Sequence, residues 1–169
     1  KDHLLALLRF AKEQGLTKVA VHAFMDGRDS GPTSGIGHIQ EFQRELKLVG
    51  IGEIASLIGR HYAMDRNNNW DRVQKAYDML TKGVGERTND PLLHIEQSYA
   101  KNINDEFIEP TIIEKNGQPI ATIQDGDAVI FFNFREDRAR EITKAFVLPD
   151  FDGFTREKKL DLHFVTMTE

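Results

Sequence analysis

The sequence contains no cysteine, which excludes disulfides and zinc–thiolate sites and fits a reducing cytoplasm. It also lacks an apolar run near the ~20 residues that a membrane-spanning helix requires. Basic residues are in the minority, with 22 lysines and arginines against 27 aspartates and glutamates. Because binding to a phosphate backbone needs an excess of positive charge, nucleic acid is not an expected partner. We therefore expect a cytoplasmic protein that binds neither membranes nor nucleic acid.

The length of 169 residues suits one domain with a single sizeable core, and 40% hydrophobic with 29% charged residues is typical of a globular protein. The first residues do not resemble a signal peptide. The chain starts at Lys1 without a methionine and stops at Glu169, directly after a predicted strand. We therefore expect residues 1–169 to be one domain excised from a longer protein.

Hydrophobic spacing predicts helices that alternate with strands. The expected helices are 2–14, 36–50, 70–83, one starting at Asn89-Asp90-Pro91, and 137–146. The expected strands are 18–25, 52–58, 111–113, 120–123, a buried strand 128–134, and 160–167, with loops at 26–35 and 59–69. Asn116-Gly117 predicts an antiparallel hairpin. The pattern predicts an α/β fold: a three-layer sandwich with a largely parallel central sheet flanked by helices, plus a small antiparallel hairpin.

Charged residues follow three of the predicted strands. They are Arg28 and Asp29 after strand 18–25, Arg60 and Arg66 after strand 52–58, and Arg135 and Arg138 after strand 128–134. In open α/β sheets, ligands bind outside the carboxyl ends of the strands, where these loops converge. A guanidinium group matches two oxygens of a phosphate or carboxylate at once and stays charged. The residues alone predict an anion-binding crevice.

Other features have ordinary interpretations. A single arginine after a strand is most often a solvated surface residue, and Asp137 is interpreted as a cap of the helix that it precedes. His22 lies inside a strand and is interpreted as a packed core residue. The six histidines show no metal-ligand spacing, and the sequence has neither a nucleophile elbow nor a phosphate-cradling glycine loop. No metal or nucleophilic site is therefore expected in this chain.

Three segments together resemble one family. They read VHAFMDGRD from Val21 to Asp29, GRHYAMDR from Gly59 to Arg66 followed by Trp70-Asp71-Arg72, and FNFREDRAR from Phe132 to Arg140. Their order and spacing, with ATIQD at 121–125 between them, are similar to those of the cofactor-independent (2,3-bisphosphoglycerate-independent) phosphoglycerate mutases. The similarity runs from end to end of the chain.

The resemblance implies a glycolytic isomerase that interconverts 2-phosphoglycerate and 3-phosphoglycerate through a phosphoserine intermediate. The chain resembles the inserted substrate-binding (phosphotransferase) domain alone. The nucleophilic serine and two manganese or similar ions would belong to a missing domain like alkaline phosphatase, so no cofactor is expected here. The parent enzyme is expected to be a monomer and this domain alone to be inactive.

By the same resemblance, the substrate-binding residues are Arg28, Asp29, Arg60, Arg66, Arg135 and Arg138. Asp29 would be the catalytic acid/base, and the surrounding arginines should keep it ionised. The family's substrate-binding histidine, in a Gly-Gly-Val-His-Ser-His stretch, is absent, and His61 stands where tyrosine is common. A non-catalytic phosphometabolite-binding module and a fragment of a related metal-dependent phosphohydrolase remain as alternatives.

Overall fold

The structure is a computed structural model that describes residues 2–168 of the chain. Its elements, in chain order, are α1 (Asp2–Glu13), β1 (Ala20–Met25), α2 (Gly35–Val49), β2 (Glu53–Gly59), α3 (Arg60–Ala63), α4 (Trp70–Lys82), β3 (Glu86–Thr88), α5 (Pro91–Ala100), the 3-10 turn η1 (Asp105–Phe107), β4 (Thr111–Lys115), β5 (Gln118–Pro119), β6 (Ala128–Phe131), α6 (Glu136–Val147) and β7 (His163–Thr166). Within this described part, no helix combines the length and apolar character needed to cross a membrane.

The strands form two sheets. The central sheet has the order β1-β2-β4-β3, with β5 paired to β4, and β6 and β7 form a separate parallel pair. Strands β1 and β2 are parallel, as are β3 and β4, whereas β2–β4 and β4–β5 are antiparallel. The predicted α/β class and the small hairpin are confirmed. The sheet differs in being mixed, because β4 runs antiparallel to β2, and in having two parts, because β6 pairs with β7 instead of joining the central sheet. The short polar strand β3 gave no hydrophobic pattern from which to predict it.

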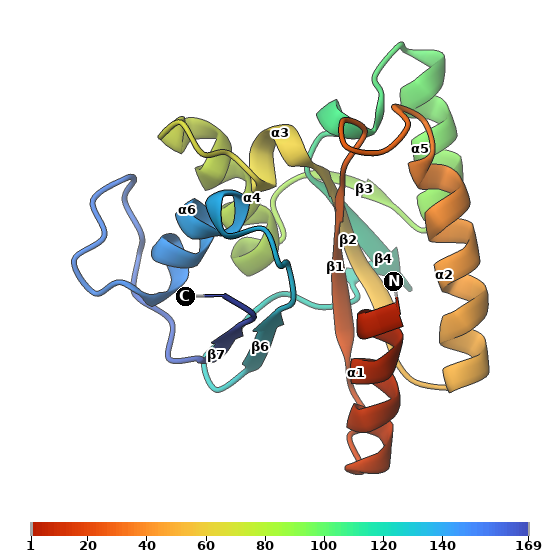
Figure 1. Cartoon of the computed structure of the whole chain (residues 1–169), viewed down its shortest axis with the longest axis horizontal. Coiled ribbons are helices and arrows are strands. Elements are labelled where there is room, and N and C mark those ends of the chain that lie inside the picture. The colour runs from red at the N-terminus through yellow and green to blue at the C-terminus, as the bar shows by residue number, and fades with distance from the viewer. Residues whose placement is uncertain (1, 169) are drawn as a thin grey trace.

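Helices cover the central sheet on both faces. Helices α1, α2 and α5 pack on one face, while α3, α4 and α6 lie on the other side together with the β6–β7 pair (Figure 1). Strand β2 runs through the middle, so Leu57 contributes to the first core and Ile58 to the second, and both side chains are fully buried. Phe24 of β1 meets Phe131 of β6 edge to face, with ring centroids 5.7 Å apart. The three-layer arrangement thus places the carboxyl ends of β1, β2 and β6 near one another.

Local sequence explains where the helices begin and end. The Asp90 carboxylate accepts the backbone N–H groups of Leu92 and Leu93 and so caps α5. Helices α2 and α4 end at Gly50 and Gly83, whose φ angles of 76° and 65° lie in the left-handed region that glycine adopts without strain. These boundaries agree with the predicted ones to within a few residues.

The predicted loop 59–69 is wrong in its first part, because α3 starts there directly after β2. A four-residue helix is too short to show hydrophobic periodicity. Gly59 makes the transition possible, since a Cβ atom at this position would lie 2.3 Å from the backbone oxygen of Glu106 in η1. The close approach of these two backbones fixes where Arg60 leaves the sheet.

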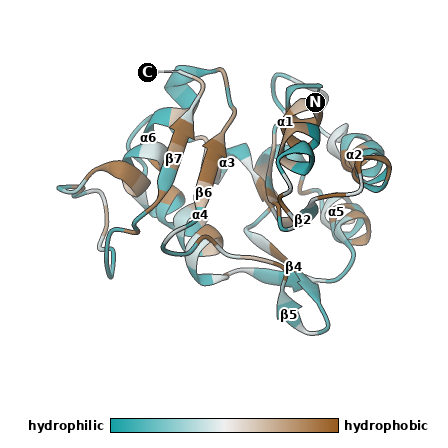
Figure 2. Cartoon of the chain, turned by 90° about the horizontal axis from the view of Figure 1, so that it is seen from below, coloured by the Kyte–Doolittle hydropathy of each residue, from teal (hydrophilic) through white to brown (hydrophobic). Residues whose placement is uncertain are grey.

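Two predicted strands also need correction. The second hairpin strand is Gln118–Pro119 rather than 120–123, because Ile123 instead donates its N–H to Leu80 at the end of α4. Strand β6 ends at Phe131, and it is half exposed rather than buried. Its Ile130 is paired with Val165 of β7, both side chains are exposed, and Figure 2 shows β6 in the brown of hydrophobic residues. A continuous apolar run therefore did not mean burial on both faces here.

His22 makes stability depend on pH. Its Nδ1 lies 2.8 Å from the Ser56 hydroxyl, and burial lowers the pKa of His22 to about 4. Because the unfolded chain binds a proton near pH 6.5 and the folded chain does not, stability falls as pH drops between these values. We expect His22 to lower the free energy of unfolding by roughly 3 kcal/mol at pH 4 relative to neutral pH. Urea unfolding of the wild type and of His22→Gln at both pH values measures it, and equal losses in the two proteins would contradict it.

Candidate functional site

The loop after β1 is folded by its own side chains. The Asp26 carboxylate accepts the N–H groups of Arg28 at 3.3 Å and Asp29 at 3.2 Å, and the Ser30 hydroxyl accepts that of Gly27. Gly27 has a φ of 68°, and a Cβ there would lie 2.7 Å from the backbone nitrogen of Glu106. This aspartate-centred turn, pressed against η1, fixes the direction in which Asp29 points.

A buried aspartate anchors the far end of the same loop. Asp105 accepts the N–H of Gly35 at the start of α2 at 2.7 Å and the hydroxyl of Tyr99, and its own N–H donates to the Pro32 carbonyl at 2.9 Å. Its side chain is almost completely buried. A carboxylate at a helix N-terminus is favourable. Sequence reasoning missed Asp105, because it lies 70 residues from the helix that it serves.

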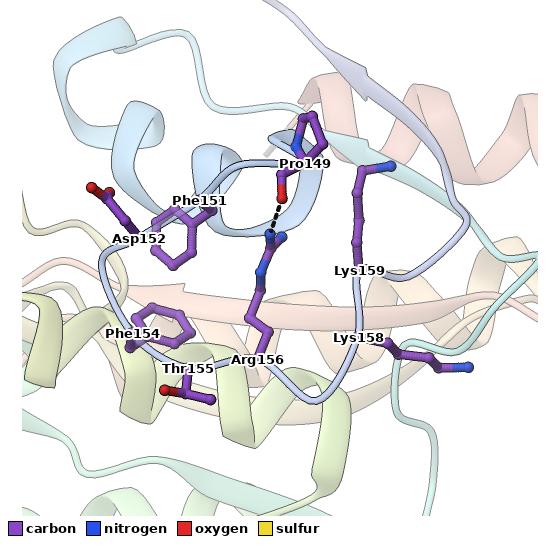
Figure 3. A pocket seen from close by; sticks show the side chains of 8 residues that line it. All are labelled: Pro149, Phe151, Asp152, Phe154, Thr155, Arg156, Lys158 and Lys159. Atoms are coloured by element: carbon purple, nitrogen blue, oxygen red, sulfur yellow. Dashed lines mark hydrogen bonds between the residues drawn. The ribbon is translucent and has the colours of Figure 1, made fainter.

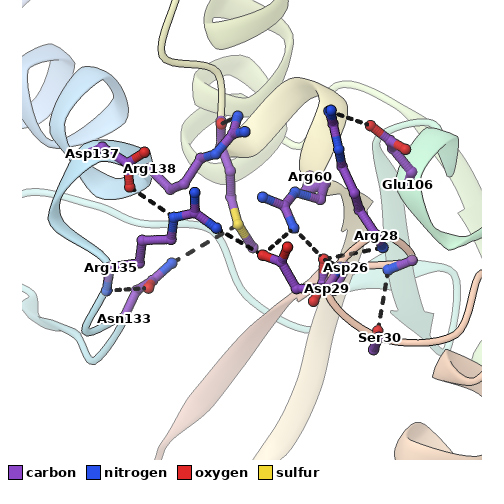
Figure 4. A network of polar contacts seen from close by, with 12 residues as sticks. Asp26, Arg28, Asp29, Ser30, Arg60, Glu106, Asn133, Arg135, Asp137 and Arg138 are labelled. Carbon is purple, nitrogen blue, oxygen red and sulfur yellow. Dashed lines mark hydrogen bonds and ion pairs between the residues drawn. The ribbon is translucent and has the colours of Figure 1, made fainter.

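Arg60 and Arg135 converge on Asp29 from two different parts of the chain. The Arg60 guanidinium, only 4% exposed, donates to Asp26 and, at 2.9 Å, to Asp29. Arg135, at the start of α6, donates to the same Asp29 oxygen at 2.8 Å. Figure 4 shows the Asp29 carboxylate between the two arginines. The predicted convergence of strand ends is therefore present in the geometry.

This environment favours the ionised form of Asp29. The hydrogen bond from Arg60 holds the pKa of Asp29 below its usual value, and the positive charges of Arg60, Arg135 and Arg138 add to the effect. The direction agrees with the sequence-based expectation that the arginines keep this carboxylate charged. A ligand that forms hydrogen bonds with these arginines in place of Asp29 must raise the pKa of Asp29 again.

Helix α6 brings a second set of charges. Asp137 accepts from Arg135 Nε at 2.9 Å and from Arg66, and the hydrogen bond from Arg135 is the main reason that the pKa of Asp137 falls to about 2. Asp137 therefore orients two arginines rather than capping the helix, which corrects the sequence-based interpretation. The sequence held a signal for only one of the two partners, because Arg135 stands two residues before Asp137 whereas Arg66 lies 71 residues away.

Arg138 has unused donor capacity. It donates to the Met64 carbonyl at 3.0 Å, but its buried Nε has no hydrogen-bond partner among residues 2–168. Burial lowers the pKa of Arg138, and repulsion from Arg60 and Arg66 adds to this. A buried donor without an acceptor, surrounded by like charges, is costly unless an anion occupies the space beside it.

These side chains surround a small polar cavity of about 160 Å³. Its lining residues are Arg28, Arg60, His61, Asp65, Arg66, Asn67, Arg72, Glu106 and Arg138. Four of the five predicted arginines are among them, while Asp29 and Arg135 form their ion pair beside it. Arg28 turns toward Glu106 at 3.6 Å. The structure thus gathers all six predicted residues in one region, and it adds Asp26, Glu106 and Arg72 to the site.

A second, larger cavity of about 480 Å³ lies inside the loop 149–159. Its arginine is already used: Arg156 donates to the carbonyls of Ala145, Leu148 and Pro149 and so caps the end of α6 (Figure 3). Lys158 pairs with Asp125. Arg156 and Lys158, two of its three positive side chains, are thus engaged in holding the loop, so we place the functional site at the smaller cavity. Across residues 2–168, no group of three or more histidine, aspartate and glutamate side chains is arranged to hold a metal ion.

Comparison with known proteins places these features in a family. A family model described as BPG-independent PGAM N-terminus matches residues 1–169. The chain is 55% identical over 168 residues to a 2,3-bisphosphoglycerate-independent phosphoglycerate mutase of Clostridium perfringens (strain 13 / Type A), which covers 99% of this chain and 33% of that protein. It is 49% identical over 170 residues to the protein of that name from Escherichia coli (strain K12), with coverage of 100% and 33%.

The fold has a similar solved structure as well. A phosphoglycerate mutase of Leishmania mexicana, determined at low cobalt concentration, matches with a TM-score of 0.89 and 27% identity over 98% of this chain and 32% of that one. The chain spans about a third of the length of the curated relatives that it matches. Since the family model covers every residue of the chain, the chain belongs to the BPG-independent PGAM N-terminus family.

Proposed function

We propose that this chain is the substrate-binding domain of a cofactor-independent phosphoglycerate mutase, an isomerase that interconverts 2-phosphoglycerate and 3-phosphoglycerate. The observation that carries the proposal is the convergence of five arginines from three separate segments on one cavity and on Asp29. The substrate has a carboxylate and a phosphate, and guanidinium groups match the oxygens of both. The relatives carry the name of this enzyme, which favours it over a phosphohydrolase or a non-catalytic module.

The role proposed for Asp29 follows from the reaction. When a phosphoryl group moves between neighbouring oxygens, one hydroxyl loses a proton and the other gains one. A carboxylate held at a fixed position can accept the proton that one hydroxyl loses and donate the proton that the other oxygen gains. Asp29 lies beside the arginines that would orient the substrate. Its lowered pKa keeps it ionised, which is the form that can accept a proton.

The rest of the chemistry belongs outside this chain in our proposal. The described residues do not offer a ligand set for the two manganese ions, so we derive no step through a metal here. We assign the metal ions and the serine that carries the phosphoryl group to the remainder of a monomeric, cytoplasmic parent enzyme of glycolysis. This domain alone is then expected to bind substrate without isomerising it.

A titration of the domain with 3-phosphoglycerate, 2-phosphoglycerate and inorganic phosphate tests the binding function. We expect amide chemical shifts to change around the site, more strongly for the glycerates than for phosphate, because two anionic groups engage more arginines than one. The reporting amides are those of Arg28, Asp29, Arg60, Arg66, Arg135 and Arg138. Changes confined to the loop 149–159 would place the ligand in the other cavity and contradict the proposed site.

A further inference from the structure

The segment that carries Arg66 is held by two side chains from α6. Arg138 donates to the Met64 carbonyl at 3.0 Å, and Glu141 Oε1 accepts the N–H of Asn68 at 2.9 Å. These two α6 residues are three positions apart and therefore lie on one face of the helix. We call residues 64–69 the Arg66 loop. Its conformation, and with it the direction of Arg66, depends on contacts with this helix face.

Asp65 fixes the loop from inside. Its carboxylate, 5% exposed, accepts the N–H groups of Asn67 at 2.9 Å and Asn69 at 3.0 Å, together with the Asn69 side-chain amide at 2.8 Å. The loop makes a tight turn in which Asn68 has a φ of 59°. With three N–H donors directed at it, the Asp65 carboxylate is strongly favoured in its ionised form. Although burial raises the pKa of Asp65, the hydrogen bonds from Asn69 and Asn67 lower it overall.

Glu141 presents a second buried carboxyl group to Asp65. It is 6% exposed and accepts the N–H of Asn68, whose neighbours Asn67 and Asn69 donate theirs to Asp65, so the two carboxyl groups lie against the same turn. Its Oε2 meets no N–H or O–H donor among the residues that the structure describes. A hydrogen bond between two carboxyl groups requires a proton on one of them, because ionised carboxylates only accept. Three N–H groups donate to Asp65 and only one, from Asn68, donates to Glu141, so the proton belongs on Glu141, whose pKa is raised by burial and by the charge of Asp65.

We propose that Glu141 is a positioning residue that carries a proton, donates it in a hydrogen bond to Asp65, and thereby holds Arg66 in the anion site. The link to substrate affinity rests on the proposed function, whereas the shared proton does not depend on that function. The other charged or titratable groups that face the pair are Arg72 of α4, Lys144 of α6 and His61 of α3.

The pair should stabilise the loop within a window of pH. Because the pKa of Glu141 is raised on folding, its contribution is present at low pH and is lost as pH rises through its folded pKa. The pKa of Asp65 is lowered, so its contribution is lost as pH falls through that lower value. Between the two pKa values the pair holds one proton, and the Arg66 loop is at its most stable.

Two variants of the full-length protein test this. Glu141→Gln replaces the acid with an amide that can donate to Asp65 and still accept from Asn68 without titrating. We expect it to keep 3-phosphoglycerate affinity at neutral pH and to keep it at alkaline pH, where the wild type loses affinity. Glu141→Ala should weaken binding roughly ten- to hundredfold, because it removes a hydrogen bond to a charged group. Glu136→Gln, at an exposed glutamate five residues earlier on α6, is the matched control and should have no effect.

Carboxyl-carbon NMR of the full-length protein decides the protonation directly and needs no ligand. We expect the Glu141 carboxyl carbon to show the chemical shift of a carboxylic acid at neutral pH. It should move downfield, to the shift of a carboxylate, only when the pH is raised through the pKa of Glu141. An ionised Glu141 at neutral pH would overturn the proposal, as would tight binding by Glu141→Ala. If the wild type binds no phosphoglycerate, the proposed function fails while the carbon shift still tests the shared proton.

Discussion

Replacement of Asp29 by asparagine in the full-length protein is expected to lower kcat by about 100- to 10,000-fold, the usual contribution of a general acid/base. Asparagine has nearly the same shape but cannot take up a proton from the substrate hydroxyl. Substrate affinity should change little or increase, because the variant removes a negative charge that competes for Arg60 and Arg135. Steady-state kinetics combined with direct 3-phosphoglycerate binding separates the two effects.

The control for Asp29 lies in the same loop. Ser30→Ala removes a hydroxyl that accepts one backbone N–H at 3.3 Å but leaves the charges of the site unchanged. It should keep most of the activity. A kcat of Asp29→Asn within a few-fold of the wild type would mean that another group moves the proton, and Asp29 would then serve only to orient the arginines.

Loss of Arg138 is expected to have the largest effect on substrate binding. Arg138→Ala should weaken 3-phosphoglycerate binding by about 2–5 kcal/mol, the range found when one partner of a buried charged pair is truncated. Arg138 lines the cavity, and its buried Nε has no partner among the described residues, so this guanidinium group has donor capacity left for a ligand. Arg138→Lys should recover only part of the loss, since lysine keeps the charge but not the planar fork. Isothermal titration calorimetry measures both.

Substitutions of two other arginines provide a comparison for the loss of affinity in Arg138→Ala. Arg66 also lines the cavity, but its side chain is 45% exposed, so solvent screens it and Arg66→Ala should cost less than Arg138→Ala. Arg140, two residues further along α6, is exposed and pairs with Glu136 away from the cavity. Arg140→Ala should leave binding unchanged. Equal effects of Arg138→Ala and Arg140→Ala would show that the cavity does not bind the ligand.

The sequence predicted those elements whose signals are local. β-Branched and aromatic residues located β1, helical spacing located α2 and α4, and Asp90 with Pro91 marked the start of α5. The clustering of six site residues followed from a general rule, that strand ends in an α/β fold meet at one edge. That rule needs only the order of strands and the positions of charged residues after them, and both are visible in one sequence.

What the sequence did not reveal depends on contacts between distant segments. Nothing near Asp105 indicates that it serves the helix starting at Gly35, and nothing near Glu141 indicates that it meets Asp65. Helix spacing even suggested an ordinary role for Asp137, which in the folded chain binds Arg66 from 71 residues away. The partners of Asp137 and Glu141 depend on how α6 packs against α4 and the Arg66 loop, and that of Asp105 depends on how η1 packs against α2. Only the three-dimensional structure defines these contacts.

The ion pairs of the free site turn ligand binding into an exchange. In the free protein, carboxylates of Asp26, Asp29 and Asp137 already occupy guanidinium groups of Arg60, Arg66 and Arg135. An incoming anion takes donors from these side chains rather than adding to a bare cluster of positive charge, so affinity should depend on ionic strength less steeply than five free arginines would give. Asp29 thus competes with the substrate for the guanidinium groups of Arg60 and Arg135. A substrate that takes these donors also lets the pKa of Asp29 rise toward its ordinary value, so binding of the substrate frees the base that acts on it.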